Sequence, residues 1–173
     1  MENLRLTTAS YLVLGLVEMA GPITPYELKA LAGESVVNFW SLPHTQIYTQ
    51  CDRLTEAGYL AEQREDEGRR RRQFTITREG RDALDVWRET DEQKPVELRD
   101  LALLKLFFGA DPKALAAEQV QVHSANLKRY EQLLEAAEGS AGEGDRAAGP
   151  IRTLRSGIGH EREFVRFWNS LLD

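Results

Sequence analysis

The sequence predicts a mostly α-helical protein whose N-terminal half also contains one short β-hairpin. Three patterns support this prediction. Capping residues and prolines precede apolar stripes at helical spacing, residues 74–77 alternate between apolar and polar as in a strand, and the second half carries apolar residues in steps of three and four. With 173 residues, the chain can form one medium domain or two small ones.

Two helices are expected before residue 40. The first covers residues 8–20, where apolar residues recur at helical spacing until Gly21 and the following proline stop them. The second begins after Thr24, because threonine can cap a helix and the proline that follows suits its first position. This helix either ends at Gly33 or continues to Phe39, and the sequence leaves both endings open.

The third helix is expected from His44 to Ala57, before a glycine that suits a helix end. Ile47, Cys51 and Leu54 lie on one face and form its apolar stripe. Cys51 is therefore expected to be a small buried residue rather than a nucleophile. The opposite face is polar and carries Thr45, Tyr48, Thr49 and Asp52.

Short extended segments follow the third helix. Residues 59–64 and 72–77 are predicted to pair as a hairpin around the turn signal at residues 66–68. Thr77 can cap a fourth helix that continues to about Thr90. Three helices, a hairpin and a further helix are typical of a winged helix-turn-helix, which we assign to residues 1–90 as a DNA-binding domain.

The second half, residues 96–173, is predicted to be a helical dimerisation domain. A short helix stops at Gly109, and a long helix begins at residues 111–112 and meets no breaker until Gly139. Four glycines between residues 139 and 149 predict a loop. The last helix is expected to start at Pro150.

Both long helices carry a heptad seam, so they are expected to pack antiparallel on each other and on a second copy of the chain. His123 and Glu161 are polar exceptions on these seams. They either form a hydrogen-bonded pair in the core or belong to a site where a ligand alters the helix pairing. The residues assigned to dimerisation are Leu115, Val120, His123, Leu127, Tyr130, Leu134, Ile151, Leu154, Ile158, Val165, Trp168 and Leu172.

An arginine run marks the tip of the hairpin. Residues 64–81 hold seven arginines and four acids, although the whole chain has a net charge of −6. A uniformly basic nucleic-acid coat is therefore excluded, and any contact with a polyanion must be local. Guanidinium groups suit phosphates and narrow minor grooves, whereas the acids at residues 65–67 could instead pair with them. The arginines assigned to DNA contact are Arg69, Arg70, Arg71 and Arg72.

The third helix is predicted to read DNA, because a helix-turn-helix places this helix in the major groove and the arginine run lies beside its polar face. Asp52 conflicts with this role, since an outward carboxylate repels phosphate. His44 either contacts DNA or covers the apolar stripe. The residues of this helix assigned to DNA contact are His44, Thr45, Gln46, Tyr48, Thr49 and Arg53.

Several other classes of protein are not expected. The sequence has no glycine-rich phosphate loop, no metal-ligand spacing and no nucleophile elbow, so neither an enzyme, a metal site nor a cofactor is predicted. The longest apolar run is too short to cross a membrane and no secretory signal is recognised, so a cytoplasmic location is expected. The alternative is a winged-helix adaptor that mediates protein–protein interaction without sequence-specific DNA binding.

Four segments together are characteristic of one family. They are residues 8–17 (TASYLVLGLV), 39–48 (FWSLPHTQIY), 53–60 (RLTEAGYL) and 74–80 (FTITREG). These segments resemble the PadR family of bacterial transcriptional regulators, and the second half is similar to the longer helical C-terminal domain of the virulence-regulator-like branch.

The resemblance implies a homodimeric transcription factor, most often a repressor, on a pseudo-palindromic operator. It also implies release by a small, often aromatic, ligand. In such a factor Tyr48 and the residues around positions 43–46 would approach double-stranded DNA, and the wing arginines would meet the backbone or minor groove. No motif in the sequence matches a ligand site of the family, so no ligand residue is assigned.

Overall fold

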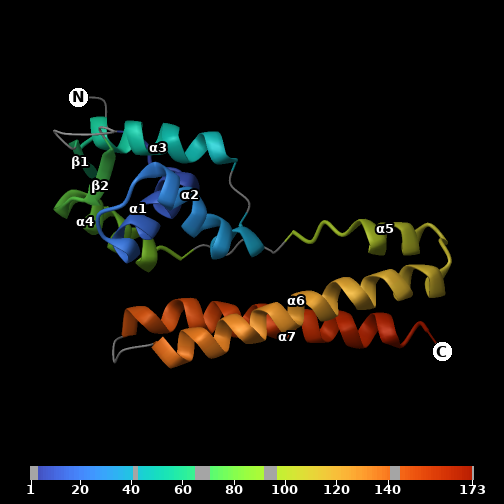
Figure 1. The fold of residues 1–173 in the computed structure, drawn as a ribbon. Coiled ribbons are helices and arrows are strands. Elements are labelled where there is room, and N and C mark those ends of the chain that lie inside the picture. The colour runs from blue at the N-terminus through green and yellow to red at the C-terminus, as the bar shows by residue number, and fades with distance from the viewer. Residues whose placement is uncertain (1–3, 41–42, 65–70, 92–96, 141–144, 173) are drawn as a thin grey trace. The chain divides into compact units, whose positions relative to one another are not determined.

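The computed structural model describes residues 4–40, 43–64, 71–91, 97–140 and 145–172. The chain divides into two compact units, an N-terminal unit (Met1–Lys94) and a C-terminal unit (Pro95–Asp173), which are described separately (Figure 1). Among the described helices, none combines the length and the apolar character that a membrane span needs.

The N-terminal unit has the helices and the hairpin that the sequence predicts, in the predicted order, so the winged helix-turn-helix is confirmed. The second helix ends at Glu34, close to the glycine stop, and a short 3-10 helix replaces the longer alternative. The elements are α1 (Thr8–Ala20), α2 (Pro25–Glu34), η1 (Val36–Asn38), α3 (His44–Glu56), β1 (Leu60–Arg64), β2 (Arg72–Ile76) and α4 (Arg78–Glu89).

Side-chain caps fix where these helices begin. Thr24 forms a capping box with Glu27: the threonine Oγ1 accepts from the Glu27 amide at 3.3 Å, and the Glu27 carboxylate accepts from the Thr24 amide at 2.9 Å. Thr77 caps α4 by accepting from the Gly80 amide at 3.0 Å. The predicted starts of both helices are therefore confirmed.

The hairpin has an additional backbone partner, Ile23, that the sequence did not predict. β1 and β2 pair antiparallel, with Leu60 opposite Ile76 and Arg64 opposite Arg72. On the other side of β2, the Ile23 amide donates to the Phe74 carbonyl at 3.1 Å, and the Phe74 amide donates to the Ile23 carbonyl at 2.8 Å. The middle of β2 is thereby tied to the segment between α1 and α2.

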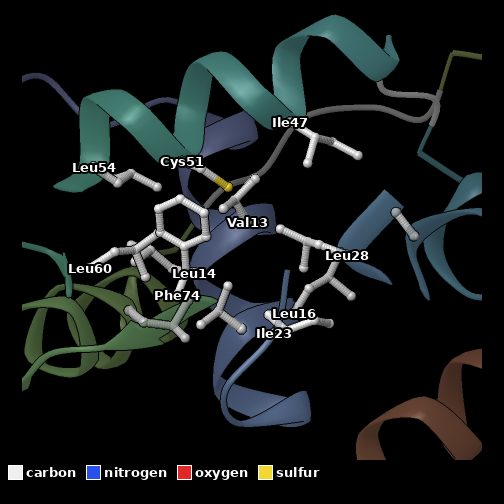
Figure 2. Packing of buried hydrophobic residues seen from close by; sticks show 13 residues of the cluster. Val13, Leu14, Leu16, Ile23, Leu28, Ile47, Cys51, Leu54, Leu60 and Phe74 are labelled. Carbon is white, nitrogen blue, oxygen red and sulfur yellow. The ribbon is translucent and has the colours of Figure 1, made fainter. Parts of the chain in front are cut away.

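One apolar core holds α1, α2, α3 and the hairpin together (Figure 2). The stripe of α3 faces Val13 and Leu14 of α1 and Phe74 of β2, and Cys51 is buried among them. Burial raises the pKa of the Cys51 thiol to about 12, so this side chain is a neutral packing group, as predicted.

The junction between α3, β1 and α4 is unusually close. The Thr77 hydroxyl donates to the carbonyl oxygens of Gly58 at 2.8 Å and Tyr59 at 3.0 Å. Gly80 is buried here, and a Cβ built on it would lie 2.2 Å from the Tyr59 carbonyl oxygen. A residue with a side chain therefore cannot occupy position 80 without moving α4 away from the start of β1.

We expect Gly80→Ala to lower the free energy of unfolding by about 1–3 kcal/mol, because it forces a methyl group against backbone. Gly33→Ala is the matched control, since nothing lies within 4 Å of a Cβ built at that α2 position. Urea unfolding of both variants measures the difference. Equal stability of the two variants would contradict the close approach.

The C-terminal unit contains α5 (Leu101–Phe107), α6 (Pro112–Ser140) and α7 (Asp145–Asn169), with α6 and α7 packed antiparallel as predicted (Figure 1). The predicted start of the last helix at Pro150 is wrong, and so is the extent of the predicted loop. The last helix begins at Asp145 and contains Pro150. A proline this near a helix start removes one backbone hydrogen bond, which packing along α6 can offset.

The heptad seam lies between α6 and α7. Its predicted residues are buried or half-buried, with one exception. Leu172 is exposed, because α7 ends at Asn169 and the helical spacing no longer applies; the neighbouring Leu171 packs instead against the cluster around Trp168.

His123 and Glu161 form a hydrogen-bonded pair inside this seam. Their side chains are each 13% exposed, and His123 Nδ1 lies 2.6 Å from Glu161 Oε2. The imidazole stacks on Phe164 with ring centroids 4.6 Å apart, and Asn126 donates to the second carboxylate oxygen at 3.4 Å. Of the two alternatives that the sequence left open, the structure supports the core pair.

Candidate nucleic-acid interface

The polar face of α3 is exposed in the N-terminal unit. Ile47 and Cys51 of the apolar stripe are each 1% exposed, and Leu54 is fully buried. Because this stripe is buried, the opposite side of the helix faces outward. A buried hydrogen bond from Ser10 Oγ to Gln50 Oε1, 2.9 Å long, also joins α3 to α1. The side chains exposed on the outward side are Thr45, Gln46, Tyr48, Thr49, Asp52 and Arg53.

The remaining predicted contacts fall partly outside the described residues. Arg69 and Arg70 lie beyond them, as do the acids at residues 65–67. His44 begins α3, but its side chain is not described. Arg71 is described, and its side chain is exposed immediately before β2.

Arg72 has a different environment from Arg71. Its guanidinium donates from Nη2 to Asp52 Oδ1 at 2.6 Å, and from Nε and Nη2 to the two oxygens of Glu62, each at 2.9 Å. It also lies over the ring of Phe74, 5.1 Å from the centroid. The fourth arginine of the run is therefore engaged with α3 and with β1, whereas the sequence assigned it to DNA.

Glu62 is the centre of this charged group. Its side chain is 14% exposed, and its carboxylate accepts hydrogen bonds from Arg72 and, at 2.5 Å, from Arg64. The hydrogen bonds from Arg72 and then from Arg64 hold the pKa of Glu62 at about 2. The pKa of Arg72 is raised by its hydrogen bonds to Glu62 and then Asp52. Two acids and two arginines thus form a charge-neutral group beside the polar face of α3.

No sequence pattern pointed directly to this group. Glu62 reads as an ordinary polar residue of a half-exposed strand, and Arg64 was counted only within the local positive charge. One signal was present: an acid at Asp52, on a face expected to meet phosphate, requires a nearby cation. The partner could not be named, because it lies twenty residues further along the chain.

Residues 13–86 match the sequence model of the transcriptional regulator PadR-like family. These residues, most of the N-terminal unit, therefore belong to the PadR-like family of transcriptional regulators. Members are transcriptional regulators rather than enzymes, in agreement with the prediction that the chain is not an enzyme.

A curated relative and several solved structures extend the similarity over both units. The chain is 25% identical over 173 residues to the negative transcriptional regulator PadR of Bacillus subtilis (strain 168), with 94% of each sequence covered. The structure of B. subtilis PadR in complex with operator DNA has a TM-score of 0.84 at 22% identity and covers 96% of this chain and 98% of that chain.

Two further structures share the fold. B. subtilis PadR in complex with p-coumaric acid has a TM-score of 0.77 at 23% identity, with 97% of each chain covered. The Vibrio cholerae virulence activator AphA has a TM-score of 0.69 at 20% identity, covering 95% of this chain and 96% of that chain.

The low pKa of Glu62 predicts a specific dependence of stability on pH. Because the folded-state pKa of about 2 lies below the ordinary value of 4.5, the ionised carboxylate stabilises the fold fully above that ordinary value. This contribution is lost as the pH falls from about 4.5 to about 2. We expect the free energy of unfolding to fall less steeply over this range in Glu62→Gln than in the wild type, measured by urea titration at each pH. Parallel curves would contradict the arrangement.

Proposed function

We propose that this PadR-like regulator binds double-stranded operator DNA as a homodimer and acts as a repressor. The supporting observation is the exposed polar row of α3 beside a hairpin that carries four consecutive arginines. A relative of the same fold is known in complex with operator DNA. Transcriptional control of this kind takes place in the bacterial cytoplasm, which is the location we propose.

Within this proposal, residues at the start of α3 read the bases. Thr45 and Gln46 are exposed in its first turn and have short polar side chains that can reach base edges in the major groove. His44 and Thr49 flank them, and Tyr48, 43% exposed, can donate its hydroxyl to a phosphate oxygen. Further along the helix, Arg53 can add a backbone contact.

The arginines that precede β2 supply the electrostatic part of binding. Arg69, Arg70 and Arg71 follow one another in the sequence immediately before β2, and an arginine side chain suits both phosphate and a narrow minor groove. Their local positive charge allows a chain of net charge −6 to approach DNA in one orientation.

Dimerisation is proposed to use the C-terminal unit. The seam assigned to it already pairs α6 with α7, and several large apolar side chains remain exposed on and beside α5, among them Leu101, Leu104, Phe107 and Phe108, which are 52–82% exposed. A contiguous apolar surface of this kind marks a protein interface, and a second copy is the occupant we propose. The dimer would hold two α3 helices about 34 Å apart, one DNA turn.

We also propose that a small aromatic ligand releases the DNA. The support is the complex of B. subtilis PadR with p-coumaric acid. The ligand residues of this chain are not assigned, because His123 and Glu161 are engaged with each other.

The DNA-binding proposal is tested by salt dependence. Duplexes bound by the protein are first selected from fragments of the source genome and footprinted. Binding through several arginines must weaken steeply as salt rises, whereas an apolar interface of a protein-binding adaptor would not.

We expect Arg70→Ala combined with Arg71→Ala to weaken binding of the selected duplex and to reduce the slope of log K against log salt by about 2. Arg78→Ala removes an exposed arginine beyond the other end of β2 and serves as the control. Fluorescence anisotropy at four salt concentrations measures both slopes. An unchanged slope in the double variant would refute the assignment of the wing.

We expect Leu104→Ser combined with Phe107→Ser to raise the dimer dissociation constant at least about tenfold, because both side chains would lie in the interface core. Both are exposed in the single chain, so the fold of the subunit should persist. Val86→Ser, a 67% exposed apolar residue of α4, is the control. Sedimentation velocity over a dilution series gives the result, and a double variant that remains dimeric would exclude this surface.

A further inference from the structure

Arg72 belongs to a charged group whose members come from three elements. We call Asp52 of α3, Glu62 and Arg64 of β1, and Arg72 of β2 the Arg72 bridge. Its contacts are 2.5–2.9 Å long, and they connect the outward side of α3 with both strands of the hairpin. The ring of Phe74, fully buried in the core, lies beneath the same guanidinium.

The planar guanidinium suits this position. Its Nε and Nη2 groups meet the two oxygens of Glu62 side by side, and Nη2 also reaches Asp52. A fork of this kind restricts the direction of both carboxylates, which a rotating ammonium group cannot do. The bridge can therefore hold the hairpin at one angle to α3.

A direct contact of Arg72 with DNA would dismantle this arrangement. To reach phosphate, the guanidinium would have to leave two carboxylates, one of which, Glu62, is only 14% exposed. Glu62 would then keep only Arg64, whose side chain is 70% exposed, and the loss of one of its two cations from a partly buried carboxylate is unfavourable. In addition, the two acids and two arginines have no net charge, so the bridge as a whole gives no attraction for a polyanion.

We propose that Arg72 is a positioning residue for DNA recognition: it bridges Asp52 and Glu62, orients the wing relative to α3 and neutralises the acid on the reading face, rather than binding phosphate itself. This inference rests on the proposed DNA-binding function. It assigns the last arginine of the run a role distinct from that of Arg71, its exposed neighbour.

The decisive measurement is the sign of the effect of Glu62→Gln on DNA binding. If Arg72 contacted phosphate, removal of a competing carboxylate would strengthen binding. Because the bridge orients the wing, we expect the variant to bind the selected duplex about two- to fivefold more weakly, the range of an ion pair at a surface. Glu56→Gln removes the same charge from an exposed position of α3 and should not weaken binding. Tighter binding by Glu62→Gln would overturn the proposal.

Arg72→Lys provides the second test, because it keeps the charge and loses the fork. A phosphate contact made through charge alone is kept by lysine, which binds phosphate as a point charge, whereas a bridge between two carboxylates needs the fork. We expect Arg72→Lys to weaken binding as much as Glu62→Gln does, and Arg78→Lys, at an exposed position of α4, to retain nearly wild-type affinity. Wild-type affinity in Arg72→Lys would overturn the proposal.

Amide hydrogen exchange tests the bridge without DNA and separates its failure from failure of the proposed function. In the full-length protein, Glu62→Gln should accelerate exchange in β1 and β2, and Glu56→Gln should not. If the wild type binds no duplex, the proposed function fails while faster exchange still supports the bridge. Unchanged exchange in β1 and β2 would overturn the bridge itself.

Discussion

The burial of one face of α3 is the constraint on which the rest of the N-terminal unit depends. Ile47, Cys51 and Leu54 lie in the apolar core with α1 and Phe74 of β2, and their removal from water fixes the rotation of the helix about its own axis. A helix rotated by 100° would bury polar groups and expose apolar ones. The outward position of Thr45, Gln46 and Tyr48 is thus a consequence of packing on the opposite side.

Ion pairs act together with core packing to orient the hairpin relative to α3. The core sets the rotation of α3 and also holds the hairpin through Leu60 and Phe74, but a two-stranded sheet is only marginally stable by itself. Two sets of contacts restrain it: backbone hydrogen bonds to Ile23 at one edge and the carboxylate contacts of Arg72 towards α3. The two described arginines of the run therefore differ: Arg71 is exposed, whereas Arg72 is held by carboxylates.

In the C-terminal unit, too, one set of side chains is buried and another set remains exposed. Its long helices bury their seam against each other, and His123 and Glu161 are paired within that seam through His123 Nδ1 and Glu161 Oε2. Apolar side chains on α5 stay exposed. Because the seam is already buried between α6 and α7, the aromatic side chains that remain exposed are available to bind another protein surface.

The sequence by itself determined the local structure. Helix starts at Thr24 and Thr77, the apolar stripe of α3 and the seam of α6 and α7 follow from spacing and capping, which act between residues a few positions apart. The start of the last helix was misjudged at Pro150, because a proline is a strong local signal whose effect depends on the packing of the whole helix.

Only the tertiary structure decided which charged and polar groups meet. The pairing of Asp52 with Arg72 and of Ser10 with Gln50 joins residues twenty and forty positions apart. Nothing in the local pattern distinguishes an arginine that faces solvent from one held by two carboxylates, since both occupy strand or turn positions with the same propensity. Their environments differ because folding brings α3 and β1 beside β2, and contacts of that range are set by the packing of the core rather than by neighbouring residues.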